Sequence, residues 1–84
     1  MAQTSEEEQG GGVKNIWTVI LIPDVGEAQH PKPNRFSSAQ EAIAAARAEA
    51  RLMFRRDPNR PESIELIVLG SGTMFSGMSE VMHR

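Results

Sequence analysis

The sequence contains no cysteine and no tyrosine, and its aromatic residues are one tryptophan and three phenylalanines. Without cysteine the chain can form no disulfide, no thiolate nucleophile and no cysteine-based zinc site. The two histidines, His30 and His83, are far apart in the sequence, and neither has the spacing of a metal-ligand set. No apolar run approaches the roughly 20 residues that a membrane-spanning helix needs. These absences favour a protein that uses no cofactor, metal, small-molecule substrate or membrane.

Acidic charge is concentrated near the start of the chain. The 84 residues carry a formal net charge of −2, and three consecutive glutamates at 6–8 are followed by three glycines at 10–12. Such a segment has nothing apolar to offset its ordering entropy. We therefore predict a disordered tail over residues 1–12 and a single small domain over residues 13–84. The tail lacks the basic start and apolar centre of a signal peptide, so a cytoplasmic location is expected.

The predicted domain is small and nearly neutral. Outside the tail, nine basic residues stand against eight acidic ones. This balance is not the charge profile of a dedicated DNA-binding domain. A single core of this size supplies only about 3–5 kcal/mol. We therefore expect either efficient packing or support from a second subunit or a partner protein.

Two apolar runs, residues 16–22 and 64–69, predict β-strands. In the first run, which Pro23 ends, large apolar side chains alternate onto both faces. A strand of this kind is either central or packs one face on a helix and the other on a partner. The alternative is that the side with Thr18 faces a loop. If the two strands pair in parallel, their connection is a right-handed crossover.

Residues 38–56 predict one long amphipathic helix between these strands. Ser38 and Glu41 form a capping box, in which the Ser38 hydroxyl accepts from the Glu41 N–H and the Glu41 carboxylate reaches back to the Ser38 N–H. Pro58 disfavours helical backbone at Asp57 and ends the helix. Helical periodicity gives a core face composed of Ala39, Ala42, Ile43, Ala46, Ala50, Met53 and Phe54.

This order of elements predicts an α+β fold, with a small sheet of three to four strands and one long amphipathic helix packed on one face. A short strand near residues 34–36 would return along the first strand. Residues 73–76 would be the returning strand of a hairpin or the start of an irregular tail. The turn at residues 70–72 favours a hairpin over a phosphate-binding loop. Its glycines lack the G-x-G-x-x-G spacing, and too few residues follow to complete such a site.

Arg47, Arg51 and Arg55 recur every four residues and predict a basic stripe on the helix, with Arg60 nearby in the sequence. One interpretation is a site for phosphates or for an acidic partner. The alternative is a solvated helix flank, since cations are favoured near the C-terminal end of a helix. No aromatic residue interleaves with the stripe, so a nucleic acid would be held by phosphate contacts alone.

The outer side of the helix is a candidate protein-binding surface. Ala44, Ala48 and Leu52 fall opposite the core face. Small residues there would let another helix approach closely, and Leu52 would supply an apolar contact. The alternative is that alanine is simply the best helix former.

The end of the chain is a second candidate surface. Met74, Met78 and Met82 recur every four residues and form one adaptable apolar stripe if the segment is helical. The alternatives are a frayed end, or packing of Met74 alone on the core.

Groups suited to catalysis are few. Asp24, Glu27 and His30 share one loop, and such a set can in principle bind a metal or transfer a proton. A single segment supplies too few ligands, however, and Gly26 and Pro31 are typical of an ordinary polar loop. We therefore predict that the protein is not an enzyme.

The layout resembles that of HicB-like antitoxins, which share a helix of the Phe36-Ser37-Ser38-Ala39-Gln40-Glu41-Ala42 kind after an N-terminal strand. It is also similar to small phage-encoded inhibitors, anti-CRISPRs among them. The resemblance is one of shape and covers residues 17–69. The proline-rich loop at residues 23–33 departs from the antitoxin pattern, and no functional residue is carried over.

The hypothesis that these patterns favour is a non-catalytic interaction or regulatory protein, of the kind that serves phages or bacteria as an inhibitor or accessory factor. It would act by protein–protein binding or self-association. The surfaces would be an exposed strand edge, the Ala44/Ala48/Leu52 side of the helix and the methionine-rich end. The alternative is a nucleic-acid-binding regulator that places the arginine stripe on phosphates.

Overall fold

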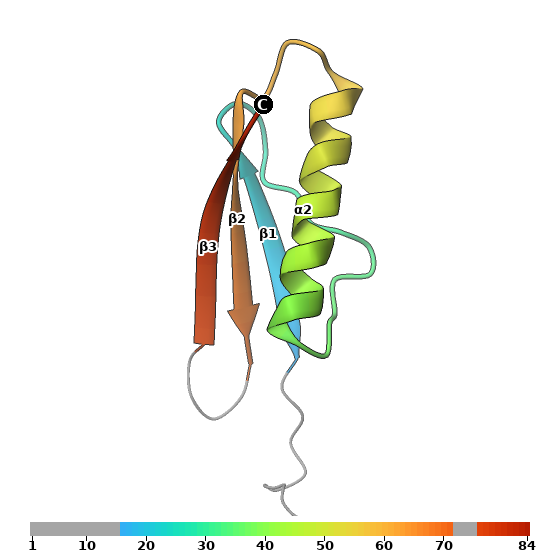
Figure 1. Ribbon diagram of the computed structural model, residues 1–84, viewed down its shortest axis with the longest axis vertical. Helices are drawn as coiled ribbons and strands as arrows, with labels where there is room; N and C mark the ends of the chain where they lie inside the picture. The colour runs from blue at the N-terminus through green and yellow to red at the C-terminus, as the bar shows by residue number, and fades with distance from the viewer. Residues whose placement is uncertain (1–15, 72–75) are drawn as a thin grey trace, which may run out of the picture.

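The computed structural model describes residues 16–71 and 76–84, which form one helix packed on an antiparallel sheet (Figure 1). The elements follow the order β1 (Trp17–Pro23), α2 (Ala39–Arg56), β2 (Ser63–Gly70) and β3 (Ser76–His83). The three strands lie in the order β1-β2-β3, so β2 is central. The predicted α+β fold is confirmed, whereas the predicted tail over residues 1–12 lies outside the described residues.

The first two strands are antiparallel neighbours, so they are not joined by a parallel crossover. The loop between β1 and α2 explains this direction, because it runs back along β1 before the helix begins (Figure 1). The helix then follows the direction of β1, and β2 returns antiparallel to it. β2 and β3 pair antiparallel, as a hairpin requires, but the returning strand is Ser76–His83 and not the predicted residues 73–76, of which 73–75 lie outside the described residues.

The hydrophobic core lies between α2 and one face of the sheet. Side chains alternate between the two faces of each strand, so every second residue of β1 and β2 points toward the helix. The small alanines on the inner side of α2 let its backbone lie close to the strands, while larger side chains fill the rest. The buried residues are Val19, Leu21, Ala42, Ile43, Ala46, Ala50, Met53, Ile64, Leu66 and Val68. Ala39 and Phe54, also predicted for this face, are only partly buried.

Gly70 and Trp17 make a close contact at one end of this core. The two residues face each other across β1 and β2. A Cβ atom at position 70 would lie 2.7 Å from the Trp17 ring, which is closer than carbon atoms pack. The absence of a side chain at Gly70 therefore makes room for the indole.

The outer edge of β1 is covered by the loop that precedes α2. Backbone hydrogen bonds join Trp17 to Phe36 in both directions, each at 2.9 Å, and join Leu21 to Gln29 at 2.7 and 2.8 Å. Between them, the Val19 N–H donates to the Asn34 side-chain oxygen at 2.8 Å, and the Asn34 amide donates to the Val19 carbonyl at 3.0 Å. The short strand predicted near residues 34–36 is therefore only an isolated bridge at Phe36. The Asn34 side chain makes the two hydrogen bonds to Val19 that the backbone of a neighbouring strand would make.

The helix begins at a cap that differs in part from the predicted one. As predicted, the Glu41 N–H donates to the Ser38 hydroxyl at 3.1 Å. The Glu41 carboxylate, however, accepts from the backbone N–H and the hydroxyl of Ser37, at 3.2 and 2.8 Å. Ser37 offers two donors to one carboxylate oxygen, whereas the Ser38 N–H offers only one.

The other end of the helix is bound by the last residue of the sequence. Asp57 is extended, with φ −136° and ψ 119°, as expected before proline. The Arg84 guanidinium donates to the carbonyl oxygens of Phe54 and Asp57, each at 2.8 Å, and to that of Pro61 at 3.0 Å. It also lies over the Phe54 ring. A cation on the terminal carbonyls of a helix is favourable, and here it ties the end of β3 to α2.

Candidate functional site

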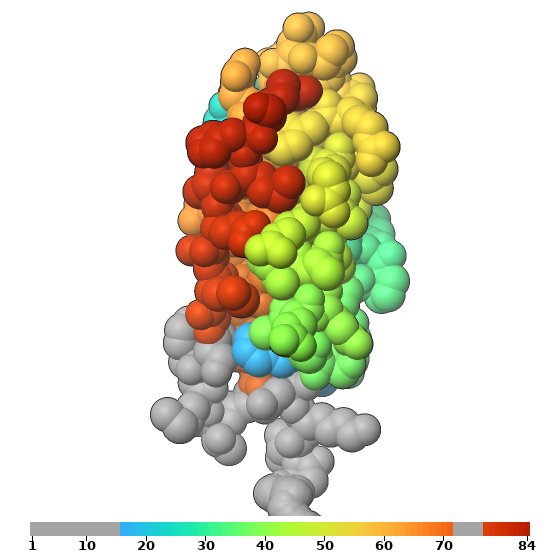
Figure 2. Space-filling view, in the orientation of Figure 1, coloured from blue at the N-terminus to red at the C-terminus, as the bar shows by residue number. Residues whose placement is uncertain are grey.

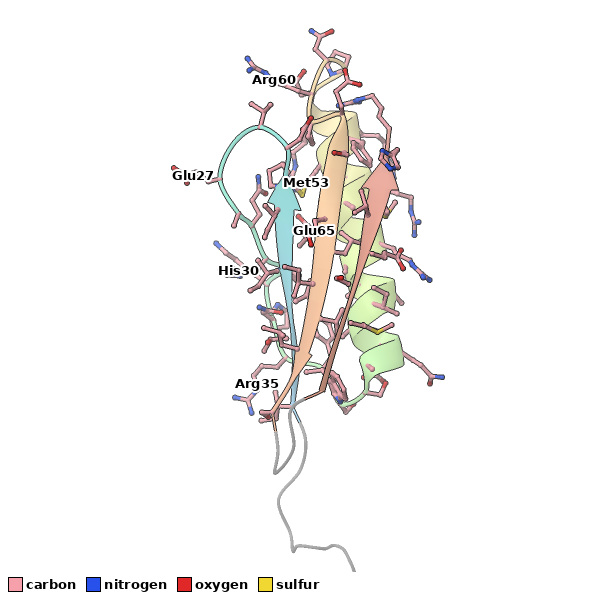
Figure 3. All side chains as sticks on the ribbon, turned by 90° about the vertical axis from the view of Figure 1, so that its left-hand side faces the viewer. Glu27, His30, Arg35, Met53, Arg60 and Glu65 are labelled. Carbon is pink, nitrogen blue, oxygen red and sulfur yellow. The ribbon has the colours of Figure 1, made fainter. Side chains whose placement is uncertain are left out.

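The sheet face away from α2 is not covered by any described element (Figure 3). The register places apolar side chains from all three strands on this open face, namely Ile20, Ile22, Ile67, Leu69 and Val81. Ile22 is 38% exposed and Val81 53% exposed, and the other three are partly exposed. Partly exposed apolar side chains gathered on one face are typical of an interaction surface.

Glu65 lies in the middle of this apolar surface (Figure 3). It is exposed on the central strand, and the register places Ile22 on one side of it and Val81 on the other. Among residues 16–71 and 76–84, no cation lies within ion-pair distance of Glu65. The open face therefore presents one carboxylate in an apolar surround.

Two shallow depressions lie on the same face, on either side of Leu69. One has a volume of about 360 Å³ and is bordered by β1, the end of β2 and Arg35. The other has a volume of about 280 Å³ and lies between β2 and β3, beside Glu65. Both are open to solvent and combine apolar residues with polar ones, Arg35 in the first and Ser79 in the second. This mixture suits the side chains of a docked protein segment.

The edge of β3 is open as well. In an antiparallel ladder, alternate residues direct their backbone groups toward opposite neighbours. The Arg84 N–H donates to the Glu62 carbonyl. With the β2–β3 register, this bond shows that the even-numbered residues of β3 direct their backbone groups toward β2. The N–H and C=O groups of Gly77, Ser79 and Val81 therefore point outward. Within the described part of the chain they have no backbone partner.

The outer side of α2 carries the predicted Ala44, Ala48 and Leu52. All three are exposed, and Leu52 is 44% exposed. Their placement opposite the core is as the periodicity predicts, but the patch is narrow because alanine adds little apolar surface. Arginine and glutamate side chains flank it along the helix.

The predicted arginine stripe is partly neutralised by the chain itself. Arg47 forms a two-bond ion pair with Glu80 of β3, at 2.8 Å for each bond; β3 and α2 lie side by side there (Figure 2). These hydrogen bonds lower the pKa of the Glu80 carboxyl and raise the pKa of the Arg47 guanidinium. Arg51 and Arg55 are exposed on the helix. Arg60 lies beyond the end of the helix, in the loop between α2 and β2 (Figure 3).

The methionine-rich end is a strand from Ser76 to His83, so the helix on which the predicted methionine stripe depended does not form there. Met78 and Met82 both lie on the side of β3 that faces α2. Met82 packs against the core, while Met78 is 47% exposed. Met74 lies outside the described residues. A strand forms here because β2 offers it a complete ladder of partners.

The loop with Asp24, Glu27 and His30 does not form a compact polar centre. Glu27 and His30 point into solvent on the β1 side (Figure 3), and Asp24 accepts from the Glu62 N–H at 3.1 Å. Over the described ranges, no three His, Asp or Glu side chains lie close enough to hold a metal ion.

Among the described residues, α2 is the one helix, and it is too polar to cross a membrane.

Sequence reasoning did not single out Glu65, Val81 or Asn34. Glu65 was detectable as the one charged residue within an apolar strand, and Val81 lies in a segment whose sequence fits neither helix nor strand strongly. Asn34 gave no signal, because its role depends on β1, which is fifteen residues away in sequence.

Comparison of the chain with protein-family models, curated proteins and solved structures found no match.

Proposed function

We propose that this is a non-catalytic interaction protein, an inhibitor or accessory factor, that binds a partner protein on the open face of its sheet. The observation that carries the proposal is the apolar face left uncovered by α2, with side chains from all three strands on it. Covering such a surface gains roughly 25 cal/mol for each Å² of apolar area removed from water. The two depressions beside Leu69 offer room for side chains of the partner.

The chemistry of the partner follows from Glu65. Burying an unpaired carboxylate is costly, so a purely apolar partner would be disfavoured. A segment that combines apolar side chains with one lysine or arginine would pair with Glu65 and cover the isoleucines around it. We therefore propose an amphipathic partner segment with a basic residue at its centre.

The experiment is affinity capture from source-cell lysate with three baits: the wild-type protein, Glu65→Arg and Glu62→Arg. Glu62→Arg is the matched control, because Glu62 is exposed but precedes β2 and lies off the open face. The proposal predicts a nuclease-resistant protein that the wild type and Glu62→Arg retain and Glu65→Arg loses. Equal retention by all three baits would contradict it.

The alternative function is a nucleic-acid-binding regulator that uses the arginine stripe. Arg47 is held by Glu80 and Arg56 by Glu49, so Arg51 and Arg55 are the helix arginines outside the ion pairs of the described residues. So few phosphate contacts support only weak binding, and its fall with rising salt is shallow because the slope scales with the number of phosphates neutralised. Captured material that disappears after nuclease treatment would favour this alternative.

A further inference from the structure

We infer that the open edge of β3 pairs with the β3 edge of a second copy of this chain. The inference deepens the proposed function and rests on it, since it treats the same sheet as an interaction surface. Gly77, Ser79 and Val81 direct their backbone N–H and C=O groups outward along a strand with continuous register. The strand contains no proline, lysine or bulge, three of the devices that proteins use to protect an edge. Its one acidic side chain, Glu80, points toward α2 and is paired with Arg47.

Charge favours a second copy over a charged partner strand. The one acidic side chain of β3, Glu80, is already paired with Arg47 of the same chain. A basic or acidic strand would therefore gain little ionic attraction at this edge. An identical strand would meet no net repulsion, provided that the two Glu80 residues are not directly opposite each other.

Two-fold symmetry restricts how the edges can meet. If the axis passed through Glu80, the two Glu80 side chains would lie opposite each other, and like charges in that position are destabilising. An axis through Ser79 or Val81 instead places Glu80 opposite Met78 or Met82 of the second copy. Either register allows about three pairs of residues to exchange backbone hydrogen bonds, because alternate residues of the edge are available.

The result of this pairing is one continuous sheet. The two-fold axis is perpendicular to the sheet, so both helices lie on one face and the two open faces join on the other. The Val81 side chains lie near the junction, and each chain keeps its own Glu65. The pairing therefore enlarges the proposed partner-binding face without covering it.

Single cysteines test the pairing directly, because the native chain has none. Residues that lie on the axis in a hydrogen-bonded pair have Cα atoms about 5.5 Å apart, within the range that a disulfide spans. We expect Ser79→Cys or Val81→Cys, whichever marks the axis, to form a disulfide-linked dimer on mild oxidation. The control Ala48→Cys, exposed on the outer side of α2, should remain largely monomeric. Equal cross-linking of all three variants would overturn the inference.

Light scattering after size-exclusion chromatography provides the second measurement, with thermal melts to verify folding. Val81→Lys should weaken dimerisation roughly tenfold or more, as expected for a charge placed on a pairing edge. Leu52→Lys is the matched control, since Leu52 is similarly exposed at 44% against 53% for Val81, and it should dimerise normally. A wild type that stays monomeric up to millimolar concentration would overturn the inference. Equal capture of the partner protein by wild type and Glu65→Arg would instead overturn the proposed function, so the two failures are distinct.

Discussion

The two edges of the sheet are finished in different ways. Along β1, the outward backbone groups of Trp17, Val19 and Leu21 are all bonded to the returning loop, one of them through a side chain. Along β3, the equivalent groups have no partner in the described residues. The loop between β1 and α2 thus covers the edge of β1, whereas no described segment covers the edge of β3. The difference identifies β3 as the edge where association is expected.

The largest effect should come from Gly70→Ala, which disturbs the closed side of the sheet. The added Cβ would meet the Trp17 ring at 2.7 Å, and overpacking of this kind costs about 1–3 kcal/mol. Chemical denaturation would measure the loss. In a Trp17→Leu background the same substitution should cost much less, because the clashing ring is gone. An equal cost in both backgrounds would contradict this explanation.

Asn34→Ala should open the closed edge. It removes both hydrogen bonds to Val19, and leaving partly buried backbone groups without partners costs about 1–2 kcal/mol. Asn59→Ala, in an exposed loop, is the control and should change stability by about 0.5 kcal/mol at most. Identical unfolding curves for the two variants would refute the role assigned to Asn34.

Arg84→Met should loosen the junction between β3 and α2. The substitution removes three hydrogen bonds to carbonyl oxygens but keeps an apolar chain over Phe54, so a loss of about 1 kcal/mol is expected. Amide exchange should accelerate in the last turn of α2 and leave the first turn unchanged. Uniform acceleration through the helix would argue against a local role.

The smallest effect concerns the ion pair that attaches β3 to α2. The pKa of Glu80 is lowered in the folded protein by the hydrogen bonds from Arg47, so its ionised form favours folding. This contribution is complete above the ordinary glutamate pKa and is lost as the pH falls through the lowered value. The wild type should therefore melt slightly above Glu80→Gln at neutral pH, and the gap should close in acid. A gap independent of pH would contradict the assignment.

Local sequence patterns were sufficient to predict the helix and the first two strands. The apolar runs and the serine cap act within a few residues, and so does the Asp57-Pro58 stop. The methionines show where such patterns fail. A spacing of four places Met78 and Met82 on one side of either a helix or a strand, and only pairing with β2 decides between them.

The candidate site depended more strongly on long-range contacts. The apolar alternation of β1 indicated a second buried or partner-binding face, but sequence could not reveal which edge the loop would cover. Asn34 bonding to Val19 holds the loop on the edge of β1, and Arg84 bonding to the end of α2 holds β3 in place at the other edge. Both residues are polar and resemble ordinary surface residues in the sequence.

Residue-resolved amide hydrogen exchange, measured in dilute and in concentrated solution, tests the difference between the edges most directly. The account predicts slow exchange at Trp17, Val19 and Leu21 at both concentrations. It predicts fast exchange at Gly77, Ser79 and Val81 in dilute solution, and slower exchange there as concentration rises and β3 edges pair. Fast exchange at the three β1 residues would contradict the account. So would an exchange rate at the three β3 residues that does not change with protein concentration.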